Sequence, residues 1–229
     1  MSLKISGVNG RDVAKVGGVA VADIAKLGPV IWYVGEDLEL YTEVDAGEYI
    51  TVTQKKATAA WIPRNADAYL YKDFGADYFN GFEIWVDSRL ESGSQVSGVI
   101  IPTMLSNVVD DAANCGSVGV KFLLYLGPAF YNYKVGVHLI RGAWEATDVW
   151  WGYSNTTYYF KLKRTAGSDT ITCEIYSDAA RSDHKQTLSV SGFGTGTKYR
   201  YLYAMASYNS GDSDQKACGF GENLKVISP

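Results

Sequence analysis

The sequence has little excess charge, no long apolar run and few of the residues that most often carry catalysis. Its 21 basic and 25 acidic residues leave a net charge of −4 at neutral pH. This balance gives no electrostatic reason to expect a nucleic-acid partner, because proteins that bind nucleic acid usually carry a basic patch. No apolar run approaches the ~20 residues of a membrane-spanning helix, so we expect no membrane partner either. Glycine and aspartate interrupt the N-terminal segment throughout, so the apolar core of a signal peptide is also missing, and we expect synthesis in a cytosol.

Cysteine and histidine are equally scarce. The three cysteines, Cys115, Cys173 and Cys218, cannot all pair within the chain, and their spacing fits no zinc motif, so we expect buried unpaired thiols. Of the two histidines, His138 is predicted to lie on the surface of a strand and His184 in a solvated turn. No nucleophile elbow, phosphate-binding loop, dinucleotide fingerprint or metalloprotease helix occurs. The sequence therefore offers no catalytic residue of these common classes.

The most informative feature that is present is an eleven-residue phrase, used twice. Residues 4–14 are echoed by 15–25, and a third copy starts at Lys26 and breaks off. Several glycines and Pro29 argue against a continuous helix, so each copy is predicted to be an extended segment, a turn and one helical turn. Such a unit cannot bury its apolar side alone. We therefore expect residues 1–37 to form an arm that anchors the protein to like chains or to other proteins. The expected assembly residues are Lys4, Ile5, Val8, Lys15, Val16, Val19, Ile24, Lys26 and Leu27.

From about residue 38 the sequence indicates one strand after another. Apolar and polar residues alternate along 158–163 and 170–176, and the glycine turn between these segments predicts a hairpin. No later window sustains a helical period for three turns, although 107–114 could form a short helix. Many strands with short turns predict a sandwich, a jelly roll or a barrel. The other expected strands are 49–53, 69–72, 82–87, 118–126, 131–140 and 199–208.

The predicted hairpin also carries a resemblance. Tyr-Tyr-Phe-Lys-Leu-Lys-Arg at 158–164, followed by Ile-Thr-Cys-Glu-Ile-Tyr-Ser-Asp at 171–178, resembles the back-sheet hairpin of concanavalin A-like lectin and glucanase domains. This is the jelly-roll class that includes laminin-G-like modules. Residues 82–86 resemble the early core strand of these domains, and 219–226 resemble their closing strand. The resemblance implies an all-β fold over residues 38–229, a sandwich of two antiparallel sheets with the repeat-built arm in front.

The N-terminal phrase resembles short repeats of tailed-bacteriophage structural proteins, where they precede jelly-roll domains of this type. This resemblance implies a virion protein made in the host cytoplasm, such as a decoration, fibre or tail-associated subunit. A homo-oligomer or other virion proteins would then be the partners of the arm. The number of chains in such an oligomer is not set by the repeat.

Hydrolysis is the function that the carboxylates disfavour. Glycosidases of this jelly-roll class carry a Glu-x-Asp-x-x-Glu strand, in which two carboxylates face one cleft about 5–5.5 Å apart when configuration is retained. Glu83 and Asp87 share a strand face here, but four residues separate them by roughly 13 Å. Glu43 and Asp45 have the closer spacing without a third carboxylate. We therefore predict a protein that is not an enzyme, with a divergent glycoside hydrolase as the weaker alternative.

Carbohydrate binding is the function that the aromatic residues favour. A tryptophan-rich loop is predicted at 144–153, and exposed tryptophan or tyrosine rings stack on sugar rings while neighbouring polar groups fix hydroxyls. Packing in the core or at a subunit interface is the alternative, because adjacent Trp150 and Trp151 would point to opposite faces of a strand. The candidate glycan-binding residues are Trp144, Asp148, Trp151, Tyr153, Asn209 and Asp212.

Calcium is the candidate metal, because many domains that this chain resembles hold one through loop carboxylates and carbonyls. Asp110, Asp111 and Asn114 offer hard oxygen ligands, and the acidic turn at 209–214 offers a second set. Neither segment reproduces a defined coordination loop. No other cofactor is expected.

Overall fold

The chain divides into two compact units, Met1–Val34 and Gly35–Pro229, in the computed structural model. The structure describes residues 35–91, 94, 96–114, 119–127, 134–142 and 145–228, together with the backbone of 4–5, 8–9, 15–16 and 19–20. Among the described residues no helix is long and apolar enough to cross a membrane.

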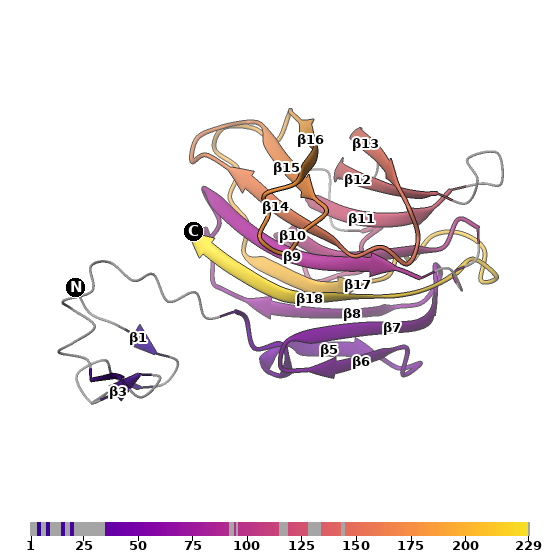
Figure 1. Ribbon diagram of the computed structural model, residues 1–229, viewed down its shortest axis with the longest axis horizontal. Helices are drawn as coiled ribbons and strands as arrows, with labels where there is room; N and C mark the ends of the chain where they lie inside the picture. Colours follow the sequence, from indigo (N-terminus) through magenta and orange to yellow (C-terminus); the bar gives the residue numbers. More distant parts are fainter. Residues whose placement is uncertain are drawn as a thin grey trace. The chain divides into compact units, whose positions relative to one another are not determined.

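The smaller unit repeats its backbone pairing with the period of the sequence. Strand β1 (Lys4–Ile5) pairs with β2 (Val8–Asn9), and β3 (Lys15–Val16) pairs with β4 (Val19–Ala20), both antiparallel (Figure 1). Ile5 lies opposite Val8 as Val16 lies opposite Val19. The extended start predicted for each of the two full copies is therefore present. The helical turns predicted after these strands, and the assembly residues Ile24, Lys26 and Leu27, lie outside the described residues.

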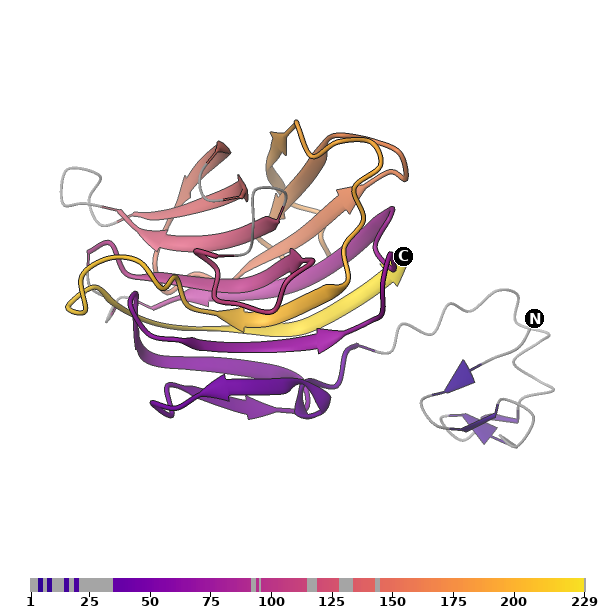
Figure 2. The ribbon, with the colours of Figure 1, turned by 180° about the vertical axis from the view of Figure 1, so that it is seen from behind.

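The larger unit is a sandwich of two seven-stranded antiparallel sheets, as the resemblance implied (Figures 1 and 2). A single turn of 3-10 helix, η1 (Leu38–Leu40), leads into it. Sheet I has the order β13 (Ala146–Gly152), β12 (Val135–Arg141), β11 (Val120–Leu126), β10 (Val99–Ser106), β17 (Tyr201–Ala206), β8 (Ala68–Asp73) and β5 (Thr42–Asp45). Sheet II has the order β16 (His184–Val190), β15 (Ile171–Tyr176), β14 (Tyr158–Arg164), β9 (Phe82–Leu90), β18 (Lys216–Ser228), β7 (Lys56–Pro63) and β6 (Ile50–Thr53).

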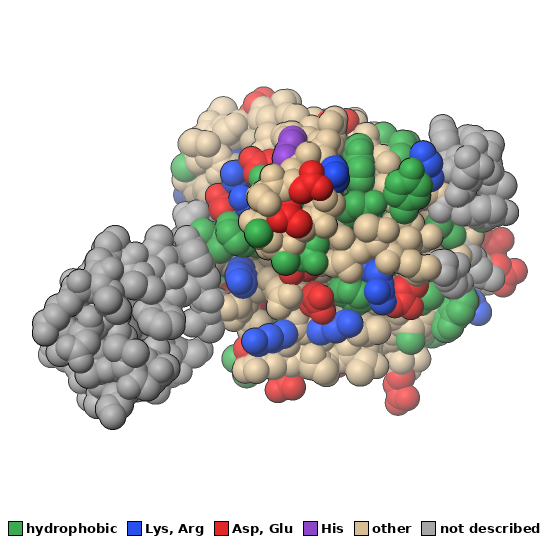
Figure 3. All heavy atoms as spheres, viewed as in Figure 1, with side chains coloured by type: hydrophobic (Ala, Val, Ile, Leu, Met, Phe, Trp, Pro, Cys, Tyr) green, Lys and Arg blue, Asp and Glu red, His purple; other side chains and the backbone are tan. Residues whose placement is uncertain are grey.

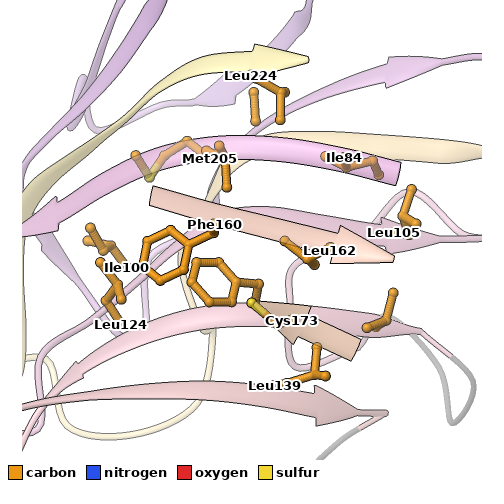
Figure 4. Packing of buried hydrophobic residues seen from close by; sticks show 14 of the residues in the cluster. Ile84, Ile100, Leu105, Leu124, Leu139, Phe160, Leu162, Cys173, Met205 and Leu224 are labelled. Atoms are coloured by element: carbon orange, nitrogen blue, oxygen red, sulfur yellow. The ribbon is translucent and has the colours of Figure 1, made fainter. Parts of the chain in front are cut away.

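One continuous apolar core fills the space between the sheets (Figure 4). Burial alternates strictly along β14, so that Phe160 and Leu162 point inward from sheet II. The ring of Phe160 packs against that of Phe122 from sheet I, with centroids 4.4 Å apart. Each fully buried side chain of this size contributes about 1.5–3 kcal/mol. Cys173 is a free thiol within this core, as predicted; Cys218 is half-buried and Cys115 lies outside the described residues.

The outer face of sheet II is held by paired charges, which Figure 3 shows as neighbouring positive and negative side chains. Asp87 on β9 accepts a hydrogen bond from the guanidinium of Arg181 at 2.5 Å, and both side chains are almost fully buried. The guanidinium also lies over the ring of Trp85, 4.6 Å from its centroid. Arg181 is in the turn between β15 and β16, so this pair fastens that turn across β14 to β9. Breaking such a buried pair typically costs about 3–5 kcal/mol.

Several local predictions were wrong. Residues 107–114 form bends and turns instead of a helix, because side chains bond to the backbone there and compete with helical pairing. The tryptophan-rich segment is strand β13 and not a loop, since it pairs with β12 along its whole length. His184 is exposed as predicted, but it begins strand β16. Five strands were not predicted: β5, β7, β10, β13 and β16.

Candidate functional site

The outer face of sheet I, turned away from the core, carries a cluster of aromatic rings. The register places Trp151 opposite Gly136 and Gly136 opposite Tyr125, in one row across β13, β12 and β11. His138 lies in the next row, and its ring centroid is 5.8 Å from that of Tyr125 and 6.1 Å from that of Trp151. All three side chains are half-buried, so each keeps part of its surface in solvent. We call Tyr125, His138 and Trp151 the aromatic platform.

Two glycines leave room for the Trp151 ring on the sheet. A Cβ atom at Gly136 would approach Trp151 Cζ3 to 3.0 Å and His138 Nε2 to 2.7 Å. A Cβ atom at Gly127 would approach Trp151 Cζ3 to 2.6 Å. Real Cβ atoms do not come this close to packed atoms, so any larger residue at either position would displace the indole ring. The platform therefore depends on these glycines for its shape.

The rim of the platform adds an exposed ring and a cation. Tyr153 follows β13 and is 64% exposed, and Lys134 Nζ lies 5.4 Å from its ring centroid. The hydroxyl groups of Ser97 and Tyr125 are 3.2 Å apart. Burial lowers the pKa of His138 to about 4, so its imidazole is neutral at pH 7. The platform thus presents neutral ring faces with hydroxyl groups and one ammonium beside them.

Two other residues of β13 point away from the platform. Trp150 packs against the apolar core, with its ring centroid 5.1 Å from that of Tyr158. Asp148 accepts hydrogen bonds from the backbone N–H of Val149 and from that of Ser189, each at 2.9 Å. Since Ser189 belongs to β16, this carboxylate joins the edges of the two sheets. Asp148, predicted as a sugar ligand, is therefore an edge-joining residue, and Trp144 lies outside the described residues.

A second aromatic cluster lies on the same face of sheet I, nearer its β5 edge. Tyr69, Tyr71, Tyr201 and Tyr203 contact one another with ring centroids 5.7–6.1 Å apart. Residues 107–114, which we call the covering loop, pass over Tyr203. The tyrosine hydroxyl bonds to the carbonyl oxygen atoms of the loop residues at 108 and 110 and accepts the N–H at 110. The covering loop thus buries the centre of this face.

The predicted calcium ligands organise the covering loop among themselves. Asp111 is 1% exposed, and its carboxylate accepts the backbone N–H of Ala113 at 2.6 Å and the side-chain amide of Asn114 at 2.8 Å. The amide of Asn209 donates to the same carboxylate at 3.4 Å. Asp110 accepts the backbone N–H of Asp111 at 2.8 Å. The two segments chosen from the sequence are thus brought together at this point.

This arrangement does not fit calcium. The ion takes six to eight oxygen ligands, whereas Asn114 and Asn209 turn their N–H groups, not their oxygen atoms, toward Asp111. The described residues contain no group of three His, Cys, Asp or Glu side chains placed to hold a metal ion. Asp212 lies in an exposed turn, where it accepts the backbone N–H of Asp214. Nearby Asp67 has a raised pKa, because of burial first and then the charges of Asp111 and Asp110.

The carboxylates considered for hydrolysis have other partners, although Glu83 and Asp87 both lie on β9. Asp87 is bonded to Arg181 and to the side-chain amide of Asn223 at 2.9 Å. Glu83 accepts the indole N–H of Trp85 at 2.6 Å. Glu43 is exposed on β5, in the other sheet. These contacts do not place two carboxylates across a shared cleft.

Comparison with known proteins identifies the fold. No protein-family model and no curated protein sequence matches the chain. The lumenal domain of VIP36, solved with Ca²⁺ and Man3GlcNAc, matches with a TM-score of 0.54 at 9% identity, over 83% of this chain and 86% of that chain. A legume lectin-like domain from Entamoeba histolytica matches with a TM-score of 0.54 at 10% identity, over 82% and 90%. The fold is the concanavalin A-like lectin sandwich. Tailspike protein 2 of the Escherichia coli O157:H7 bacteriophage CAB120 matches with a TM-score of 0.50 at 11% identity, over 88% of this chain and 27% of the tailspike chain.

Substituting Gly136 by alanine should push the Trp151 ring off the sheet. The added methyl group overpacks the site, so we expect a loss of about 1–3 kcal/mol in unfolding free energy and a changed near-ultraviolet circular dichroism spectrum. Gly196→Ala is the matched control, because no atom lies within 4 Å of its Cβ position. Equal spectra and stabilities for the two variants would show that Gly136 does not set the ring position.

The buried imidazole of His138 should make the fold sensitive to acid. Its folded pKa of about 4 is below the ~6.5 of an unfolded chain, so the unfolded state binds more protons between these values. Stability therefore falls as the pH drops through this window, by roughly 2–3 kcal/mol at about pH 4.5. Urea unfolding at neutral and at acid pH measures this loss of stability. We expect the His138→Phe variant to lose less stability at acid pH than the wild type, by the amount that His138 contributes. The same substitution at the exposed His184 is the control. An equal loss of stability in acid for the wild type and His138→Phe would contradict the assignment of this pH dependence to His138.

Proposed function

We propose that the chain is a non-enzymatic carbohydrate-binding protein whose sugar contacts lie on the aromatic platform of sheet I. The observation that carries this proposal is the cluster of half-buried rings in the aromatic platform, with the exposed Tyr153 at its rim. The C–H faces of a pyranose pack on aromatic rings, and hydroxyl or ammonium groups at the rim can bond to sugar hydroxyls. Ser97, Tyr125 and Lys134 supply such groups beside the rings.

The rigidity of the platform suits this role. Its rings meet nearly edge to face, with interplanar angles of 65–83°, and the indole packs closely over Gly127 and Gly136. A preorganised ring loses little conformational freedom on binding. The fold neighbours give further support, since VIP36 was solved with Man3GlcNAc and the Entamoeba domain is described as legume lectin-like. The separate partners of Asp87 and Glu83 support binding without hydrolysis.

Trp151→Ala should abolish most retention on a glycan array while leaving the fold intact. Losing one stacking ring costs about 1.4 kcal/mol, or roughly tenfold in affinity. Trp61→Ala is the matched control, because Trp61 is 49% exposed on β7 of sheet II, away from the platform. Retention that survives Trp151→Ala would place the sugar elsewhere. A large fall in melting temperature would instead show that Trp151 is needed for packing.

We also propose that the chain is a structural protein of a bacteriophage particle, in which the repeat unit anchors and the sandwich binds. Two observations favour this second function: the repeated N-terminal phrase with its repeated strand pairing, and the likeness in fold to a phage tailspike. The two functions are compatible, because a virion protein can adhere to glycans. Such a protein would be made in the host cytoplasm and assembled with copies of itself or with other virion proteins.

Removing residues 1–34 should convert an oligomer into a folded monomer. The deleted segment is a compact unit of its own, so the sandwich should keep its melting temperature. Light scattering on the full chain and on the truncated chain measures the mass of each. An oligomer of unchanged mass after truncation would rule out the repeat unit as the assembly element, and a monomeric full chain would leave attachment to an unlike partner as its role.

A further inference from the structure

A lysine side chain is fully buried under the covering loop. Lys121 lies near the start of β11, between Met104 of β10 and Ile140 of β12, and its side chain is on the outer face of sheet I. It is 0% exposed. Lysine is almost never fully buried unless its charge is compensated, because removing an ammonium from water is costly. The position therefore demands partners for the charge.

The partners come from the covering loop and from the segment after β17. The ammonium donates a hydrogen bond to the carbonyl oxygen of Ala112 at 2.6 Å and lies 5.2 Å from the ring centroid of Tyr208. Ala112 directly follows Asp110 and Asp111, so the cation sits beneath the acidic part of the loop. The buried ammonium of Lys121 thus bonds to the covering loop at Ala112, the residue next to the buried carboxylate of Asp111.

The same place in the molecule is where the sequence predicted calcium. A calcium ion would need oxygen atoms from Asp111, Asn114 and Asn209, but both asparagine amides donate their N–H groups to the Asp111 carboxylate. An ammonium needs only hydrogen-bond acceptors and a ring face, which the Ala112 carbonyl and Tyr208 provide. A second cation close to Lys121 would also be repelled by it.

We propose that the ammonium of Lys121 does the work of a loop-organising metal ion, holding the covering loop on sheet I without calcium. Lys121 is a positioning residue, since it acts on the loop backbone and through it on the outer face of the sheet. The loop in turn covers Tyr203, which contacts Tyr69 and Tyr71. The proposal does not depend on carbohydrate binding, because it concerns how the face is built.

The test compares melting temperatures of the full-length protein with calcium, with a chelator, and after substitution. The wild-type melting temperature should be the same in millimolar calcium and in excess EDTA, and the purified protein should contain no stoichiometric calcium by elemental analysis. Lys121→Met keeps the length of the side chain and removes its charge, leaving the Ala112 carbonyl without its donor. We expect it to lower the melting temperature by roughly 5–15 °C. Lys185→Met is the matched control, because Lys185 pairs with Asp183 on the surface and should shift the melting temperature by at most a degree or two.

A wild-type melting temperature that rises with calcium or falls with EDTA would overturn the proposal, as would Lys121→Met melting with the wild type. If Lys121→Met yields no folded protein, Lys121→Arg keeps the charge and should fold, and its failure would show a demand for size instead of charge. Glycan retention is read separately. A protein that binds no sugar, yet responds to Lys121→Met and not to calcium, would support this inference while removing the proposed function.

Discussion

Sheet I is buried on both faces around its centre, and much of the molecule follows from this constraint. Every residue of β10 is buried, although its side chains alternate between the core and the outer face. A sheet face can be buried only if another segment covers it, and the covering loop does so through the hydroxyl of Tyr203 and the ammonium of Lys121. The aromatic platform lies on the same face toward the β13 edge, where its rings keep some surface in solvent.

The same constraint explains which strands the sequence reveals. Strands β14 and β15 have one dry and one wet face, so their residues alternate and both were predicted. Strand β10 shows no alternation and contains Pro102, which lies where its register with β11 shifts. Strand β16 was not predicted for the opposite reason: it is an edge strand and exposes most of its side chains. The resemblance to concanavalin A-like domains supplied the sandwich that these local patterns leave open, and the fold neighbours confirm it.

The candidate site was only partly predictable, for a different reason. Trp151 and Tyr153 stand out in the sequence as aromatic residues in one segment, but Tyr125 and His138 join them only through the pairing of β11, β12 and β13. Register across strands decides which side chains share a face, and a shift of one residue would exchange Trp151 for Trp150. The same alternation turns Asp148 toward Ser189 of β16. Proximity along the sequence thus grouped Asp148 with Trp151, although the two side chains lie on opposite faces of the strand.

A comparison of two buried cations, Arg181 and Lys121, shows how the outer faces of the two sheets differ. Arg181 lies flat on Trp85 and bonds to Asp87, so a planar cation and a carboxylate neutralise each other on sheet II. Lys121 instead meets a carbonyl oxygen of the covering loop and the ring face of Tyr208, which suits a compact cation with three donors. On the part of sheet II around Arg181 a positive charge is therefore matched by a negative charge. On sheet I the buried ammonium bonds to the backbone of the covering loop, and the neutral rings of the aromatic platform keep part of their surface in solvent. Stacking of a ligand is favoured more on neutral rings such as those of sheet I than on the ion pair of sheet II, since desolvating a neutral ring costs far less than desolvating an ion pair.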